Sequence, residues 1–207
     1  LTGEPDRDPI KIGGSLADIV TGLYAFHGIL LSLFVRQRSG RGQHVDISLL
    51  DSMVSTLAYQ AEIYLMTGRS PTRMGSRHPS IVPYESFRTT DGFINIAVTN
   101  QKQWENFCKA MELPKVATDP RFDSNPNRIK NYEPLKAILD QTIRKLTRAE
   151  ITERLFAVGI PVGPINTVGE ILEDPHIRAR QMVEELTHPE YGPLRMLGIP
   201  IKLSETP

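Results

Sequence analysis

The sequence predicts an α/β protein in which a small α+β domain lies between two parts of a larger layer. Apolar side chains recur every three or four positions over residues 16–34, which is typical of a helix with a wide, mostly buried apolar face. Residues 84–88 and 93–98 are predicted to form two short strands joined at a turn around Asp91 and Gly92. Two segments rich in glycine and proline, 67–83 and 159–164, flank a block of helices and strands. A chain that leaves one layer, builds a block and returns indicates an inserted small domain.

The first elements have recognisable ends. The first helix is expected to begin after Ser15, which we expect to form a capping box with Asp18. Gly40 is expected to end that helix. Alternation over 44–49 predicts a short strand, and Asp51 is expected to cap a second helix that runs over 51–66.

The inserted block begins with a hairpin that turns at Asp91 and Gly92. Its last helix is expected to start with a capping box of Thr147 and Glu150. Further helices are predicted at 101–111, 132–146, 148–158, 168–172 and after Pro175, and further strands at 183–187, 194–196 and 199–203.

Composition excludes several classes of protein. The 207 residues include 24 Lys plus Arg and 24 Asp plus Glu, with no basic run, which argues against a protein built to coat nucleic acid. The single cysteine, Cys108, excludes an internal disulfide framework and a cysteine zinc site, and the five histidines show no metal-ligand spacing. No uninterrupted apolar run approaches 18 residues, so no membrane span is expected. Because a single cysteine cannot form an internal disulfide, a reducing compartment, the cytoplasm, is expected.

Asp18 is the most informative carboxylate. It lies in the first turn of the apolar helix, where free N–H groups and the helix dipole stabilise an anion. Such surroundings keep a carboxylate ionised, as a carboxylate nucleophile requires. The alternative is that Asp18 only stabilises the helix end, and spacing alone does not separate the two interpretations.

Two further sets of residues are candidates for binding. The segment from Gly75 to Pro79 is a loop in which Arg77 can pair with a carboxylate or phosphate and His78 can act as an acid or base. Arg41 closes a basic cluster at the end of the first helix. That cluster either offsets the helix dipole or contacts a phosphate.

Several motifs, occurring in order along nearly the whole chain, resemble the class III coenzyme A transferase family, the CaiB/BaiF type. They are LADIVTG at 16–22, GRGQHVDISLLDS at 40–52, GSRHPSIVPY at 75–84, DPRF at 119–122, GIPVGPIN at 159–166, DP at 174–175 and HP at 188–189.

The resemblance implies a fold and an assembly. Members have a large domain with an open, nucleotide-binding-like α/β sheet built from both ends of the chain, a small α+β domain in between, and two subunits interlocked as a homodimer. The chain would then be an internal fragment that lacks the N-terminal half. The implied division is large domain with the nucleophile helix at 1–66, linker at 67–74, small domain at 75–159, linker at 160–174 and a return toward the large domain at 175–207.

The resemblance also implies an activity. Asp18 corresponds to the family's nucleophile, which would move CoA from an acyl-CoA to a carboxylic acid through anhydride and aspartyl-CoA thioester intermediates. Gly75, Arg77, His78 and Arg41 become candidate contacts for substrate or CoA. The CoA thioester is a substrate, and no permanently bound cofactor or metal is expected. Two alternatives stay open, namely a 2-methylacyl-CoA racemase that uses the same Asp18 as an acid/base, and a fragment without catalytic activity.

Overall fold

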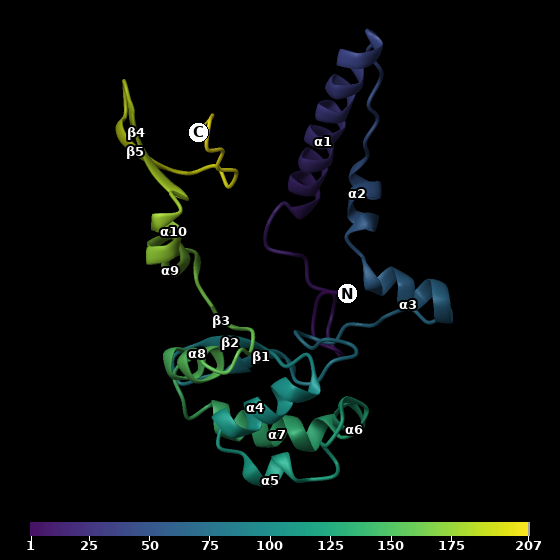
Figure 1. Cartoon of the computed structure of the whole chain (residues 1–207), viewed down its shortest axis with the longest axis vertical. Coiled ribbons are helices and arrows are strands. Elements are labelled where there is room, and N and C mark those ends of the chain that lie inside the picture. The colour runs from purple at the N-terminus through teal and green to yellow at the C-terminus, as the bar shows by residue number, and fades with distance from the viewer. Residues whose placement is uncertain (207) are drawn as a thin grey trace. The chain divides into compact units, whose positions relative to one another are not determined.

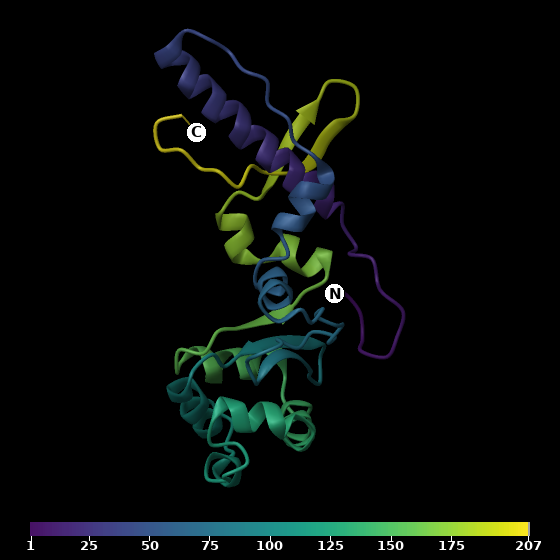
Figure 2. The ribbon, with the colours of Figure 1, turned by 90° about the vertical axis from the view of Figure 1, so that its right-hand side faces the viewer.

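The structure is a computed structural model that describes residues 1–206. The chain forms two compact units, Leu1–Ser76 and Arg77–Pro207. Figure 1 labels the helices and strands of each unit, and Figure 2 shows the same ribbon from the side. Helices dominate the first unit and both sheets lie in the second, so the chain is a mixed α/β protein as predicted.

The first unit is entirely helical in its regular structure. It contains α1 (Leu16–Ser39), α2 (Leu49–Ser55) and α3 (Tyr59–Thr67). The predicted strand at 44–49 is wrong, because this segment runs beside α1 without pairing to another strand. Val45 packs instead against α1, where a Cβ added to Gly28 would lie only 2.8 Å from Val45 Cγ1. Gly28 therefore permits a close approach of this segment to the helix.

The predicted helix over 51–66 is two helices. Ala58, with a φ of 46°, breaks it between α2 and α3. The cap of α2 is also one turn earlier than predicted, because the Ser48 hydroxyl accepts a hydrogen bond from the Asp51 N–H at 3.0 Å. Asp51 is thus the third residue of α2 rather than its cap.

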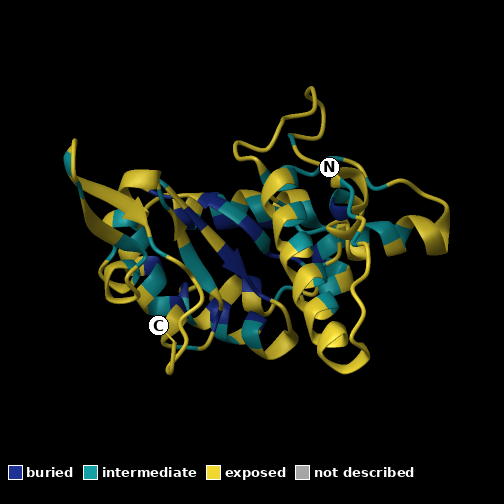
Figure 3. Cartoon of the chain, turned by 90° about the horizontal axis from the view of Figure 1, so that it is seen from above, coloured by how far each residue is buried: buried dark blue, intermediate teal, exposed yellow. Residues whose placement is uncertain are grey.

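The apolar face of α1 is exposed, so the prediction that it is mostly buried is wrong for this part of the chain. No residue of α1 is buried among the residues described, and Figure 3 shows the helix in the colours of exposed and intermediate residues. Large apolar side chains such as Ile19, Leu23 and Ile29 are each more than half exposed. The periodicity is real, and within the first unit the 41–48 segment and α2 pack along the helix.

By length and composition α1 is the one helix among the described residues that could cross a membrane, with a mean hydropathy of 1.6 over its most apolar window. The expectation of no span relied on the stricter criterion of an uninterrupted apolar run. Core helices of soluble proteins and signal sequences meet the same composition test, so α1 carries no membrane assignment on this ground.

The second unit holds a three-stranded antiparallel sheet in the order β1-β2-β3. The elements of this block are β1 (Tyr84–Arg88), β2 (Phe93–Ala97), α4 (Gln101–Ala110), α5 (Pro114–Ala117), α6 (Asn125–Lys130), α7 (Tyr132–Ile143), α8 (Arg148–Phe156) and β3 (Val162–Ile165). The hairpin and the long helices were predicted, and the Thr147–Glu150 capping box is confirmed. The short α5 and α6 were not predicted, and β3 was expected to be an irregular connection.

The core lies on one face of this sheet. Phe87 on β1 and Ile94 and Ile96 on β2 are completely buried, and Figure 2 shows α4 and α7 on one side of the strands. Trp104 and Cys108 of α4 are buried, and burial raises the pKa of the Cys108 thiol to about 12. The thiol therefore stays protonated and unreactive at neutral pH.

The remaining elements of the second unit are α9 (Val168–Glu173), α10 (Pro175–Ala179) and a hairpin of β4 (Val183–His188) and β5 (Gly192–Leu197). They match the predicted helices and the first two predicted strands. The third predicted strand, at 199–203, is wrong, because these residues pair with no strand among those described.

One charged side chain, Arg128 of α6, lies inside this core with 1% of its surface exposed. Its Nε donates to the Val82 carbonyl at 2.8 Å and its Nη1 to the Phe122 carbonyl at 3.0 Å, and the guanidinium lies over Trp104. No carboxylate pairs with it among residues 1–206. Arg128 thus satisfies buried carbonyls and fixes the segment before β1 against the helices.

We predict that Arg128→Ala lowers the free energy of unfolding by about 3 kcal/mol, because it opens a cavity and leaves two buried carbonyls unpaired. Urea unfolding of the full-length protein measures this loss, and hydrogen exchange at the Val82 amide should accelerate. Arg121→Ala is the matched control, since Arg121 also stacks on an aromatic ring, that of Phe122, but is exposed. Equal effects of the two substitutions would contradict the assignment.

Candidate active site

Asp18 occupies the third position of α1 and is exposed. Ser15 precedes the helix as predicted, but its side chain makes no capping hydrogen bond, so the expected capping box with Asp18 does not form. Among residues 1–206 no group hydrogen bonds to the Asp18 carboxylate or pairs with it. The carboxylate is therefore beside free helix N–H groups but is not engaged in capping.

Arg41 lies at the opposite end of the same helix. Gly40 closes α1 in the left-handed conformation, with its N–H donating to the Arg36 carbonyl. At 1.5 Å per residue, the helix separates Asp18 from Arg41 by about 30 Å. Within the first unit the structure thus does not bring these two candidates together, and the binding role of Arg41 stays a prediction.

Gly75 closes a turn against the N-terminal loop of the first unit. Its φ is 62°, and its N–H donates to the Gly3 carbonyl at 3.0 Å. A Cβ there would lie 3.0 Å from a Glu4 carboxylate oxygen. The position thus favours glycine for a conformational and a steric reason.

The loop that follows Gly75 is held by α6. The amide of Asn125 accepts from the Val82 N–H at 3.0 Å and donates to the Ser80 carbonyl at 2.8 Å. Together with the bond from Arg128 to the Val82 carbonyl, these contacts hold three consecutive peptide groups, from the Ser80 carbonyl to the Val82 carbonyl. The segment that carries Arg77 and His78 is therefore anchored at its C-terminal end.

His78 is packed onto β1. Its ring stacks on Tyr84 with centroids 5.1 Å apart and planes 9° apart, and its Nδ1 accepts from the Ser80 N–H. Burial lowers the pKa of His78, which keeps the imidazole neutral at neutral pH. The positive charge of the loop therefore resides on Arg77.

Arg77 is stacked flat on another aromatic ring. Its Cζ lies 3.7 Å from the centroid of the Tyr132 ring, and its Nε is sealed from solvent without an acceptor. No carboxylate lies within ion-pair distance of Arg77 among residues 1–206. The structure thus presents a guanidinium that is oriented but not neutralised by a direct partner.

Beneath Tyr132 lies a buried carboxylate, Glu85, with 4% of its surface exposed. It accepts a hydrogen bond from the Tyr132 hydroxyl at 2.8 Å, and Lys136 Nζ lies 3.7 Å from the same Glu85 oxygen. Desolvation raises the pKa of Glu85, while the bond from Tyr132 and the charge of Lys136 oppose that rise. Desolvation and Glu85 in turn raise the pKa of Tyr132, so its hydroxyl stays a donor.

Four residues of this region were not predicted as functional from the sequence: Glu85, Tyr132, Asn125 and Arg128. A signal was available for Glu85, because it alternates with Phe87 on the face of β1 that packs on the core. A charged residue at such a position needs a partner. No pattern in the sequence indicated Tyr132 or Arg128, because their partners are distant along the chain.

Two of the motifs meet at the open face of the small sheet. Tyr84, from the motif at 75–84, and Gly163, from the motif at 159–166, line one pocket with Asn95 of β2. Asn95 stands opposite Gly163 in the register of β2 and β3. The second breaker-rich segment thus forms a strand that completes this sheet beside Tyr84.

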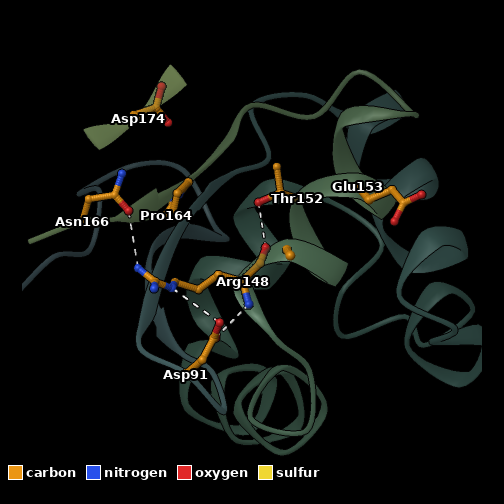
Figure 4. A pocket seen from close by; sticks show the side chains of 8 residues that line it. Asp91, Arg148, Thr152, Glu153, Pro164, Asn166 and Asp174 are labelled. Atoms are coloured by element: carbon orange, nitrogen blue, oxygen red, sulfur yellow. Dashed lines mark hydrogen bonds and ion pairs between the residues drawn. The ribbon is translucent and has the colours of Figure 1, made fainter. Parts of the chain in front are cut away.

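A second pocket, drawn in Figure 4, surrounds Arg148. Its guanidinium binds Glu170 at 2.7 Å and the Asn166 side chain at 3.4 Å, and its backbone N–H donates to Asp91 at 2.9 Å. The bond from Arg148 is the main cause that lowers the pKa of Glu170 to about 2. These groups form hydrogen bonds and ion pairs with one another, and they join the β1–β2 turn to β3 and α9.

No group of three or more His, Cys, Asp or Glu side chains is placed to hold a metal ion in the part of the chain that the structure describes. Three charged candidates from the sequence form no ion pair among residues 1–206, namely Asp18 and Arg41 in the first unit and Arg77 in the second.

Comparison with known proteins gives one consistent family. Succinate–glutarate CoA-transferase of Agrobacterium fabrum is 36% identical over 207 residues, which are all of this chain and 52% of that protein. Acetyl-CoA:oxalate CoA-transferase of Acetobacter aceti is 35% identical over 204 residues, 98% of this chain and 51% of that protein. The chain thus spans about half the length of the curated relatives it matches.

Solved structures indicate the same family as these relatives. A CAIB/BAIF family protein from Brucella suis superposes with a TM-score of 0.81 at 41% identity, over 99% of this chain and 53% of that one. The family model described as CoA-transferase family III matches residues 1–207. The chain therefore belongs to CoA-transferase family III, the CaiB/BaiF type that its motifs resemble.

Proposed function

We propose that the full-length protein transfers CoA from an acyl-CoA to a carboxylic acid through covalent intermediates on Asp18. The observation that supports this most is the carboxylate of Asp18, which lies in the first turn of α1 without a hydrogen bond or ion pair to residues 1–206. A nucleophile must keep its oxygen lone pairs available, and the free N–H groups of the helix end favour its ionised form. Membership of the family supports the type of reaction.

The reaction follows from carboxylate chemistry. An Asp18 oxygen attacks the thioester carbonyl, and CoA leaves as the thiolate to give a mixed anhydride. The thiolate attacks the Asp18 carbonyl of the anhydride, which releases the donor acid and forms an aspartyl-CoA thioester. The acceptor carboxylate then displaces CoA to form a second anhydride, and the thiolate attacks the acceptor acyl carbon, which regenerates Asp18. The energy of the thioester is conserved if water is excluded from each anhydride.

The acids on which the protein acts are dicarboxylic in this proposal. Arg77 is an oriented guanidinium without a carboxylate partner among the described residues, and a planar fork of this kind binds a carboxylate in bidentate fashion. Succinate, glutarate and oxalate, named in the two relatives above, are dicarboxylic acids. We assign Arg77 rather than His78 to the distal carboxylate, because the pKa of His78 is lowered and its Nδ1 is already an acceptor.

The resemblance carries further proposals for the intact protein. It would work in the cytoplasm as an interlocked homodimer, with the CoA thioester as substrate and no permanently bound cofactor. Gly75 and Arg41 stay candidate contacts for substrate or CoA.

The role of Asp18 is tested by substitution in the full-length protein. We expect Asp18→Asn to lower the rate of CoA transfer by more than about a thousandfold, because the amide is a poor nucleophile. Asp51→Asn is a matched control, since Asp51 is also the third residue of a helix in the same unit. It should leave transfer near the wild-type rate, measured by formation of the new acyl-CoA.

Retained transfer in Asp18→Asn would contradict the nucleophile and support a role in helix stability alone. Exchange of the α-proton of an acyl-CoA with deuterated water, without transfer to any acid, would instead indicate a racemase.

The role of Arg77 is tested by comparing two acceptor acids of equal length, succinate and butyrate. We expect Arg77→Ala to lower kcat/KM for succinate about 10- to 100-fold relative to that for butyrate, because a charge-assisted interaction with the distal carboxylate is lost. Steady-state kinetics of the full-length protein measure the ratio. An unchanged ratio in Arg77→Ala would remove Arg77 from acid recognition.

A further inference from the structure

The stack of Arg77 on Tyr132 links the loop to the core of the small domain. Tyr132 is the first residue of α7, and its ring faces the guanidinium at 3.7 Å. The terminal Nη atoms of Arg77 are neither bonded to the described protein nor sealed from solvent, whereas Nε is sealed. The ring therefore fixes the plane of the guanidinium and leaves its outer edge open. An arginine held in this way loses less conformational entropy when it binds a carboxylate.

Tyr132 is itself held from below. Its hydroxyl donates to Glu85 at 2.8 Å, and Glu85 is buried on β1. Since both ends of this bond lie on regular elements, α7 and β1, the phenol ring cannot tilt without breaking it. A hydrogen bond to a charged acceptor is among the stronger ones in a protein.

Lys136, one turn further along α7, balances the charge of Glu85. Its Nζ lies 3.7 Å from Glu85, 4.5 Å from the centroid of the Phe87 ring, and pairs also with Asp140. The carboxylate of Glu85 thus has a hydrogen-bond donor and a cation of its own. The charge of Arg77 also acts on Glu85 and helps to hold its pKa down, but the two groups form no direct ion pair, so the outer edge of the guanidinium stays open to a ligand.

We propose that Tyr132, held by Glu85, is a positioning residue that sets the preference of the enzyme for dicarboxylic acids by orienting Arg77. This inference rests on the proposed function, in which Arg77 binds the distal carboxylate. Tyr132 acts only through Arg77 and does not contact the acid.

A double-mutant cycle in the full-length protein tests this proposal. The readout is the ratio of kcat/KM for succinate to that for butyrate, which a general loss of folded or active enzyme does not change. We expect Tyr132→Leu to lower the ratio about fivefold, the value of one cation–π contact, mainly through a higher KM for succinate. Tyr132→Phe keeps the ring and loses only the bond to Glu85, and its ratio should fall between wild type and Tyr132→Leu.

The decisive comparison is made in the Arg77→Ala background. There Tyr132→Leu should leave the ratio unchanged, because the residue that it positions is absent. Phe93→Leu is a matched control, since the ring of Phe93 in β2 also lies under an arginine, Arg88 of β1. It should not change the ratio.

The remaining outcomes distinguish a failure of the Tyr132 proposal from a failure of the Arg77 proposal. If Arg77→Ala lowers the ratio but Tyr132→Leu lowers kcat/KM for both acids in parallel, Tyr132 is structural and the present inference is wrong. The same holds if Tyr132→Leu still lowers the ratio without Arg77. If Arg77→Ala itself leaves the ratio unchanged, the proposed dicarboxylate role fails first. Tyr132→Phe keeps the test valid if Tyr132→Leu does not fold.

Discussion

The block from β1 to β3 depends on one buried cation, the guanidinium of Arg128. It is 1% exposed and donates hydrogen bonds to the carbonyls of Val82 and Phe122, so it joins the segment before β1 to the helical layer. A buried charge is costly unless every hydrogen bond is made, and here carbonyl groups and the Trp104 ring replace water. With Asn125, this contact determines where the segment containing Arg77 ends, and hence where its guanidinium can lie.

Charge compensation distinguishes Arg148 from two of the candidate residues, Asp18 and Arg77. Arg148 is surrounded by Asp91, Glu170 and Asn166, and it joins elements rather than presenting a charge. Asp18 and Arg77 differ, because no oppositely charged side chain among residues 1–206 pairs with either. A charged group without a direct partner in the protein is available to a charged or polarised substrate. The proposed reaction uses the first as nucleophile and the second as a receptor for an acid.

Local rules predicted most of the second unit, and long-range packing explains the failures. The hairpin that turns at Asp91 and the capping box of Thr147 and Glu150 depend on residues close in sequence, and both are present. The burial of α1 was predicted wrongly, because periodicity shows that a face is apolar but not whether a covering layer lies within residues 1–206. For the candidate site, motifs pointed to Asp18, Arg77 and His78 as candidates whose roles stay predictions, whereas no motif pointed to Tyr132, because its partner Glu85 is 47 residues away.

The central claim is that Asp18 becomes covalently attached to the substrate during transfer. The most direct measurement is to incubate the full-length protein with succinyl-CoA, quench with hydroxylamine or with borohydride, and analyse the Asp18 peptide by mass spectrometry. The account predicts a hydroxamate or a reduced side chain at Asp18, formed only when the CoA ester is present. An unmodified Asp18 in a preparation that actively transfers CoA, or an adduct on a different residue, would contradict it.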